Sequence, residues 1–363
     1  MISSKMKINI LICFFCLMFF SCTGSKYYSI ADFEKAPKTD VHFHYDTWDD
    51  TYLKYASSMN MHLFTINVDA GEPLEKQAGI SKLLEENYPE WIDFLTTFSI
   101  DSFECDNFSD EVIMSIEKAM SEGAKGVKIW KNIGMALKGH DGEYVMIDHP
   151  AFIPIFEYLQ TNGIPLMAHL GEPRNCWLPY DEITMNSDLR YYKKHPEYHM
   201  YQHPDAPSYE EQIAARDQIL ENYPDLKFVG AHIGSLEWSI EEVANRFEKY
   251  PNFNVDLSAR MGHIQFQTIE DREKVRSFFI KYQDRILYGS DMTLSEDITD
   301  VEKRCESLKE GWRSHWLFLA TDDIIPADKF NLPNSPETIQ GLQLPREVVD
   351  KIFNDNAKRI FPD

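Results

Sequence analysis

The sequence predicts a closed parallel α/β barrel, a (β/α)8 fold of the TIM-barrel type. Eight short apolar runs, rich in β-branched and aromatic residues, alternate with longer stretches of helical period, and this alternation is typical of such a barrel. The length agrees, because these barrels reach ~250 residues or more as one domain and the chain has 363. A doubly wound open sheet is the alternative.

The strand-like runs come first in each repeat. They lie at 39–44 (TDVHFH), 62–69 (HLFTINVD), 93–101 (DFLTTFSID), 124–130 (AKGVKIW), 164–170 (IPLMAHL), 227–233 (KFVGAHI), 252–258 (NFNVDLS) and 286–291 (ILYGSD). Stretches with apolar residues at helical spacing predict helices, at 74–88, 110–121, 150–161, 209–222, 236–249, 270–283 and 346–360.

Two connections are longer than the usual few residues, namely 174–207 after the fifth strand and 292–345 after the eighth. Both follow the carboxyl ends of strands, so we expect long loops over the face where barrel active sites are built. Both contain aromatic residues, among them Trp177 in the first and Trp312 and Trp316 in the second. Such rings either stack on a substrate ring or pack the loops onto the barrel.

The charge balance is strongly acidic. The chain has 36 Lys and Arg against 59 Asp and Glu, a formal net charge of −23 at pH 7. Nucleic-acid phosphates are bound by basic faces, so we expect no nucleic-acid partner.

The N-terminus differs in composition from the rest. Lys5 and Lys7 precede an almost wholly apolar run at 8–20, and small residues follow, which is the pattern of a secretory signal peptide. The run is shorter than the ~20 residues that span a bilayer. Cys22 stands at its end after a small residue, as in the lipobox of bacterial lipoproteins, although Phe19 replaces the usual leucine.

These features predict a lipoprotein-type signal peptide at 1–21, lipidation of Cys22, a tether at 22–36 and a single barrel domain at 37–363. The protein would then be exported and anchored to a membrane of the cell envelope through its N-terminal lipid. Ordinary cleavage that leaves a free cysteine is the alternative. The later cysteines, Cys105, Cys176 and Cys305, are odd in number and widely spaced, so no disulfide framework is indicated.

Histidines and an aspartate stand where several of the strands end. His42 and His44 close the first strand and, two residues apart, point to the same side. His169 ends the fifth strand, His232 the sixth and Asp291 the eighth. Buried His and Asp are costly unless they are paired or bind a metal, so their meeting at one rim indicates a metal centre.

The same residues carry a resemblance that covers 39–361. The segments DVHFHYD, GAKGVKIW, IPLMAHLGEP, LKFVGAHIGS, DRILYGSDM and KIFNDNAKRIF resemble the amidohydrolase superfamily. They are most similar to its amidohydrolase-related group, which includes aminocarboxymuconate-semialdehyde decarboxylase and sugar-lactone hydrolases. The resemblance implies that His42, His44, His169 and Asp291 bind one divalent ion, zinc first and manganese second, and that His232 is an acid/base beside it.

The chemistry of these groups agrees with that implication. Neutral imidazoles and a carboxylate suit zinc-like ions, and an open coordination position lets the ion activate water near neutral pH. Asp291 can then take a proton from that water and pass it to a leaving group. His232 can polarise or protonate the substrate; a structural histidine is the alternative.

Three basic residues near strand ends are candidates for substrate binding. Lys128 lies in the fourth strand, where binuclear relatives carry a carboxylated lysine and single-metal relatives a lysine that binds an anionic substrate; a lysine that reaches solvent is the third alternative. Arg174 and Arg260 follow the fifth and seventh strands and offer planar forks to carboxylates. Glu172 and Asp256 are expected to orient these arginines or the histidines.

Three functions remain open. The first is a metal-dependent hydrolase, in which activated water attacks a lactone, ester or amide of a small anionic or carbohydrate-derived substrate. The second is a metal-dependent decarboxylase that uses the same site. The third is a non-catalytic, tethered glycan-binding protein. All three imply a small-molecule ligand, and a homo-oligomer stays possible.

Overall fold

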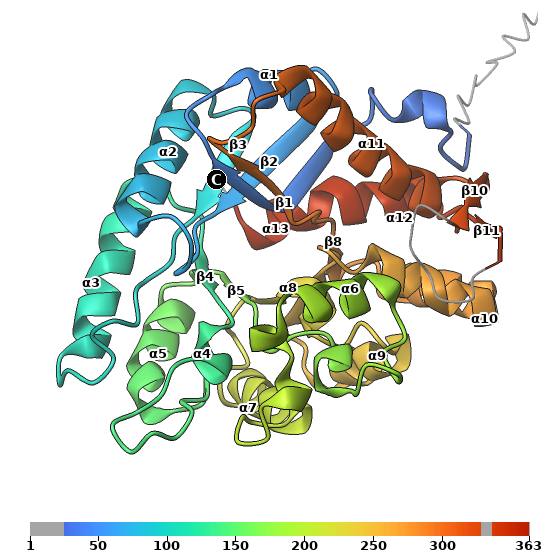
Figure 1. Ribbon diagram of the computed structural model, residues 1–363. Coiled ribbons are helices and arrows are strands. Elements are labelled where there is room, and N and C mark those ends of the chain that lie inside the picture. The colour runs from blue at the N-terminus through green and yellow to red at the C-terminus, as the bar shows by residue number, and fades with distance from the viewer. Residues whose placement is uncertain (1–24, 328–335, 363) are drawn as a thin grey trace, which may run out of the picture.

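A computed structural model describes residues 25–327 and 336–362. All eight predicted strands are present, in order and parallel, and the helices surround them (Figure 1). The strands are β1 (Lys38–Asp46), β2 (Met61–Ile66), β3 (Ile92–Leu95), β4 (Val127–Ile129), β5 (Leu166–Ala168), β6 (Phe228–Gly230), β7 (Phe253–Asp256) and β8 (Ile286–Leu287), which continues after a break as β9 (Met292–Ser295).

Backbone hydrogen bonds join these strands into a ring. One sheet has the order β3-β2-β1-β9 and the other β4-β5-β6-β7-β8. At the β3–β4 seam the amide of Lys125 donates to the carbonyl of Phe94 (2.9 Å). At the other seam the amide of Val41 donates to the carbonyl of Tyr288 (3.0 Å), and that of Asp291 to the carbonyl of His42 (2.7 Å). The closed barrel predicted by the sequence is therefore confirmed.

The predicted helices are present with shifted ends. They are α2 (Leu74–Asn87), α3 (Phe108–Ser121), α5 (Ile153–Thr161), α7 (Tyr209–Asn222), α9 (Ile240–Lys249), α10 (Met261–Lys281), and a last helical segment made of α12 (Arg346–Asp350), one π turn (Lys351–Asp355) and α13 (Asn356–Ile360). Short helices α1 (Thr51–Ser57), α4 (Asn132–Met135) and α6 (Asn186–Lys194) were not expected, and α8 (Ala231–Gly234) is a single distorted turn.

The connection after the eighth strand is not a long loop over the site. It contains the 20-residue helix α11 (Val301–Ala320) and two short antiparallel strands, β10 (Ile324–Pro326) and β11 (Thr338–Gln340). The helix packs against α1 at the side of the barrel, and its Trp312 and Trp316 are buried. These tryptophans therefore pack the barrel rather than offer rings to a ligand.

The segment before β1 also packs on the barrel. The ring of Tyr28 lies 4.9 Å from that of Trp316, and Phe33 is buried beside the same ring. The buried ammonium of Lys38 donates to the carbonyls of Phe33, Ala36 (2.7 Å) and Met59 (2.7 Å). The tether predicted at 22–36 is thus bound to the barrel from residue 27 onward.

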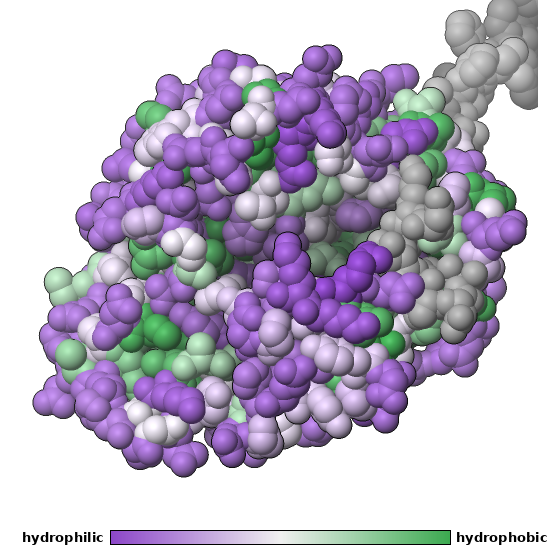
Figure 2. Space-filling model, in the orientation of Figure 1, coloured by the Kyte–Doolittle hydropathy of each residue, from purple (hydrophilic) through white to green (hydrophobic). Residues whose placement is uncertain are grey.

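The signal peptide and Cys22 lie outside the described residues. Within the described ranges, no helix is long and apolar enough to span a membrane. The exposed face in Figure 2 is mostly hydrophilic, as the acidic composition leads one to expect.

Candidate metal centre

The strand ends bring the five predicted metal-site residues into one cavity. This cavity has a volume of about 240 Å³ and lies at the carboxyl ends of the barrel strands. Its lining includes side chains that the sequence singled out and others that it did not. The lining residues are His42, His44, Val68, Lys128, Trp130, Lys131, His169, His232, Asp291 and Thr293.

Asp291 is the centre of the arrangement. Its Oδ1 lies 3.4 Å from Nε2 of His42 and 3.2 Å from Nε2 of His44. In the described part of the chain, one group of three potential ligands, His42, His232 and Asp291, has its ligand atoms within 4.8 Å of one another. Two imidazoles and a carboxylate at this spacing fit a divalent ion such as zinc.

His169 and His232 contact each other across the same cavity. Nε2 of His232 lies 3.1 Å from Nδ1 of His169. The other nitrogen of His169, Nε2, is buried and has no hydrogen-bond partner among the described residues. A buried nitrogen without a partner is costly, and a metal ion is one group that would satisfy it. The ligand set implied by the sequence and the compact group share His42 and Asp291; the first adds His44 and His169, and the second adds His232.

Strained backbone holds two of these residues in place. Residues 232–235 all have positive φ, with 58° at His232, 61° at Ile233 and 57° at Ser235, and Asp291 has φ 64°. This conformation is rare outside glycine, above all for a β-branched residue such as Ile233, and costs about 1–3 kcal/mol at each position. Such strain is typical of functional sites.

Asp256, the last residue of β7, and Ser258, two residues later, contact the histidines that line the cavity. Oδ2 of the buried Asp256 accepts from Nδ1 of His42 (2.7 Å), and its Oδ1 accepts from the backbone amide of His232 (2.8 Å). The carbonyl of Ser258 lies 3.0 Å from Nδ1 of His232. The sequence predicted an orienting role for Asp256, while Ser258 was missed because a serine at a strand end carries no distinctive signal.

The electrostatics favour metal ligation. Burial lowers the pKa of His42, and it lowers the pKa of His169 and His232 well below the ordinary value. Neutral imidazoles keep a lone pair for a metal ion. Burial alone would raise the pKa of Asp291, but the imidazoles of His232, His44 and His42 outweigh it and hold that pKa well below its usual range, so the carboxylate is charged.

Lys128 lies in this cavity as an isolated cation. Its side chain is 1% exposed, and among the described residues its Nζ has no hydrogen-bond partner. Burial lowers the pKa of Lys128 to about 8, against the opposing charges of Asp256 and Asp291. At pH 7 the group is therefore a buried ammonium that no described residue contacts by a hydrogen bond.

The two predicted arginines lie elsewhere. Nη2 of Arg260 is 3.5 Å from a carboxylate oxygen of Glu172, and the guanidinium of Arg174 stacks 4.4 Å from the ring of Trp238. Neither arginine is among the described residues that line the cavity. Lys131, which the sequence analysis did not single out, does line it and pairs with Glu172.

Comparison with known proteins identifies the family. The family model described as amidohydrolase matches residues 105–362. Among curated proteins, none matches the chain significantly. A crystal structure described as amidohydrolase II has 16% sequence identity and a TM-score of 0.50, and the alignment covers 90% of this chain and 100% of that one.

Two further solved structures are similar at lower scores. The 2,6-dihydroxybenzoate decarboxylase from Rhizobium has 17% identity and a TM-score of 0.48, covering 90% of this chain and 98% of its own. The 4-oxalomesaconate hydratase from Rhodopseudomonas palustris has 12% identity and a TM-score of 0.46, covering 90% and 95%. At such identities the likeness concerns the fold, and the activities belong to those proteins.

Proposed function

Because the chain belongs to the amidohydrolase family, we propose that it is a metal-dependent hydrolase. Its substrate would be a lactone, ester or amide of a small anionic or carbohydrate-derived molecule. The observation that carries this proposal is the position of Asp291, a charged carboxylate whose Oδ1 lies within 3.4 Å of two histidine nitrogens in a cavity. Hydrolysis requires a base at that point to receive a proton from water.

The ligand set fits one divalent ion, with zinc favoured over manganese. His42, His44 and Asp291 would hold it, together with His169 or His232. When bound, such an ion supplies the Lewis acidity that activates water and polarises a carbonyl.

The protein's own side chains would transfer the protons and bind the substrate. Asp291 accepts a proton from the attacking water and returns it to the leaving oxygen or nitrogen. His232, if it is not itself a ligand, acts as an acid/base toward the substrate through Nε2, the ring nitrogen that faces the cavity. Lys128 binds a negative group of the substrate, because an isolated buried ammonium gains most from an anion. Charged groups in a small cavity interact more strongly than they would in water.

A decarboxylase that uses the same residues is the competing function, since a substrate carboxylate would also suit Lys128. The two are separated by their products. The purified protein, loaded with zinc or manganese, would be offered anionic sugar lactones and esters in one series and aromatic carboxylic acids in another. Acid release measured by pH-stat is expected in the first series; CO2 release in the second would replace the hydrolase with a lyase.

Variants connect any activity to the site. Asp291→Asn and His42→Ala are each expected to lose turnover and bound metal together. If both variants bind a glycan as well as the parent does and the parent turns nothing over, the protein is a binding protein and the proposal fails.

We also propose that the protein is exported and held at a membrane by a lipid on Cys22. The support is the sequence pattern at 1–24 alone. Fractionation of cells that produce the Cys22→Ala variant is expected to move the protein from the membrane to the soluble fraction, and unchanged membrane association would contradict the lipid anchor.

A further inference from the structure

One buried carboxylate contacts two functional histidines at once. Asp256 is 0% exposed and stands at the end of β7, between β8 and β6, the strand that His232 follows in the turn α8. Its Oδ2 accepts from Nδ1 of His42 at 2.7 Å. Its Oδ1 accepts from the backbone amide of His232 at 2.8 Å and from the amide of Ser258 at 3.1 Å.

Ser258 completes the connection between the two histidines. Its hydroxyl donates to Oδ1 of Asp256 and lies 3.0 Å from Nδ1 of His42 and 2.9 Å from Nδ1 of His232. Its carbonyl oxygen is 3.0 Å from the same Nδ1 of His232. A carboxylate and a carbonyl oxygen only accept hydrogen bonds, so each histidine must carry its proton on Nδ1.

Because the proton is on Nδ1, the lone pair of each histidine is on Nε2. In His42 that atom lies 3.4 Å from the carboxylate of Asp291, and in His232 it lies 3.1 Å from Nδ1 of His169. Both lone pairs therefore belong to the atoms that meet in the cavity. A histidine that binds a metal usually donates its other N–H to a carboxylate or carbonyl oxygen in this way.

The same carboxylate also restrains the strained turn. His232 and Ile233 have φ of 58° and 61°, and such strain persists only where surrounding contacts over-determine it. The bond from the amide of His232 to Asp256 is one such contact, and the hydroxyl of Ser235, which donates to the carbonyl of Leu170 at 2.9 Å, is another.

We propose that Asp256, together with Ser258, is a positioning unit that fixes the Nδ1–H tautomer of both His42 and His232, so that the Nε2 lone pair of His42 faces the metal site and that of His232 faces the same cavity. The unit couples a ligand on β1 to a histidine in the turn after β6 through a residue of β7 that is not among the described residues lining the cavity. This inference rests on the metal site of the proposed function, but the tautomers it assigns exist without the metal.

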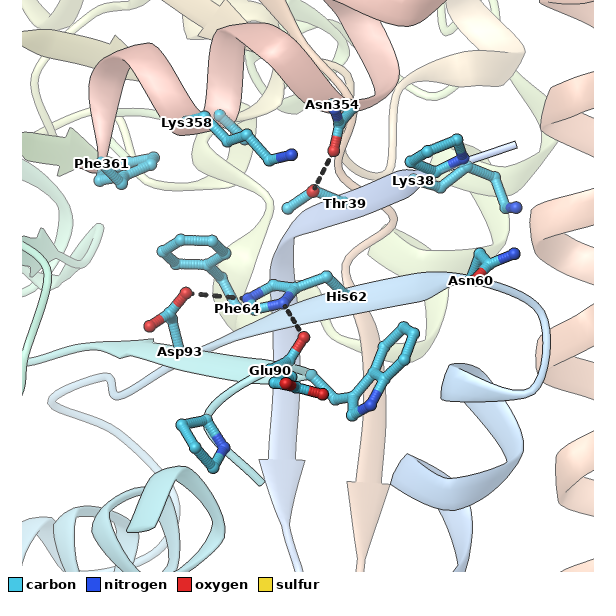
Figure 3. A pocket seen from close by; sticks show the side chains of 14 residues that line it. Lys38, Thr39, Asn60, His62, Phe64, Glu90, Asp93, Asn354, Lys358 and Phe361 are labelled. Atoms are coloured by element: carbon cyan, nitrogen blue, oxygen red, sulfur yellow. Dashed lines mark hydrogen bonds and ion pairs between the residues drawn. The ribbon is translucent and has the colours of Figure 1, made fainter. Parts of the chain in front are cut away.

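The chain offers a matched control at the opposite end of the barrel. His62 and Asp93 form a second, partly buried His–Asp pair, with Nε2 of His62 2.8 Å from Oδ2 of Asp93 and Nδ1 3.1 Å from the carbonyl of Glu90 (Figure 3). This pair lines a different cavity, together with Lys38 and Phe64. Asp93→Asn thus removes the same kind of pair without touching the metal centre.

The first experiment measures the tautomers in metal-free protein. Histidine ring nitrogens are labelled with 15N, and the signals of His42 and His232 are assigned by their loss in His42→Ala and His232→Ala. The parent is expected to show protonated Nδ1 and unprotonated Nε2 in both residues. In Asp256→Asn the pattern of His42 is expected to become mixed or to reverse. An unchanged pattern there would overturn the proposal.

The second experiment measures zinc affinity by competition with a chromophoric chelator. Asp256→Asn is expected to weaken binding by about 10–100-fold, Ser258→Ala by less, and Asp93→Asn not at all. Asp256→Glu keeps the negative charge but displaces the carboxylate, so this variant is also expected to bind zinc weakly. A zinc affinity equal to that of the parent would mean that only the charge of Asp256 matters and would refute the positioning role. Loss of affinity in Asp93→Asn equal to that in Asp256→Asn would refute it as well.

The His42→Ala variant separates this inference from the metal site itself. If His42→Ala binds zinc as well as the parent does, the proposed metal site is wrong. If His42→Ala loses the metal and Asp256→Asn keeps it, the site stands and the positioning unit falls. Far-ultraviolet circular dichroism shows whether each variant is folded.

Discussion

Replacing Lys128 with methionine is expected to stabilise the fold while weakening the binding of an anionic substrate. The ammonium is 1% exposed, and its Nζ has no hydrogen-bond partner in the described part of the chain. Burial lowers the pKa of Lys128 from 10.5 to about 8. At about 1.4 kcal/mol for each pKa unit, the buried charge costs about 3 kcal/mol. Methionine fills a similar volume and carries no charge, so most of that cost is recovered.

The assay is urea unfolding of the metal-free parent and of the Lys128→Met variant at pH 7. We expect the free energy of unfolding to rise by about 2–3 kcal/mol, and Tm by about 3–4 °C for a chain of this size. With a turned-over anionic substrate, KM is expected to rise more than kcat falls. Lys128→Arg, which keeps the charge, is expected to show no such stabilisation.

A loss of more than about 1 kcal/mol in Lys128→Met would refute the reasoning, because it would mean that Nζ has a favourable partner. A carboxylated lysine that bridges two metal ions is such a case. A carboxylated Lys128 would be recognised by a second metal ion per chain in the parent and by an increase in the mass of the protein that disappears in acid.

Three further predictions concern the metal, the acid stability and a buried hydrogen bond. His169→Ala and His232→Ala decide which histidine completes the ligand set. Elemental analysis is expected to show that His169→Ala loses the metal, whereas His232→Ala keeps the metal and loses turnover. The opposite pattern would make His232 the ligand. Burial beside Tyr288 lowers the pKa of His315 to about 4. Between pH 6.5 and 4 the unfolded state therefore binds more protons at this residue than the folded state does. The contribution of the neutral His315 to stability is complete above pH ~6.5 and is lost as the pH falls through 4. After a discount for partial exposure, the lost stability amounts to about 2 kcal/mol. His315→Gln is therefore expected to flatten the dependence of the unfolding free energy on pH between 6.5 and 4. An equal slope in the parent and the variant would contradict this prediction. The indole of Trp312 donates to the buried carboxylate of Asp40 (2.9 Å), so Trp312→Phe is expected to lower the unfolding free energy by about 1–3 kcal/mol. Trp316→Phe, which removes a bond to the carbonyl of the exposed Ser29, is expected to lower it by less.

The eight strands could be predicted because each is a short apolar run that ends in polar residues. The helix α11 could not be recognised as easily, although Val301, Cys305, Leu308, Trp312 and Trp316 recur at helical spacing. Gly311 and many charged residues interrupt the pattern, and the length of the connection suggested a loop. The tryptophans were the signal, since residues of that size are seldom spaced in this way by chance.

The candidate site was predictable to the extent that it depends on strand ends. His42, His44, His169, His232, Lys128 and Asp291 lie together because parallel strands present their carboxyl ends to one face. Arg174 and Arg260 follow strands too, but whether an arginine faces a cavity or a neighbouring acid is decided by side-chain packing between segments far apart in sequence. Glu172, two residues before Arg174, contacts Arg260 instead, and strand order alone does not determine such a pairing.

The break in the eighth strand explains how Asp291 can be both a barrel residue and a ligand. β8 pairs with β7, and β9, which begins at Met292 directly after Asp291, pairs with β1. Asp291 lies between these two strands with φ 64°, and its amide donates to the carbonyl of His42 at 2.7 Å. The backbone of one candidate ligand is thus bonded to the backbone of another, so their separation is set by the barrel's own closure rather than by a loop. Because this bond belongs both to the seam that closes the barrel and to the candidate centre, a change that loosens the β8–β9 break should weaken metal binding before it unfolds the protein.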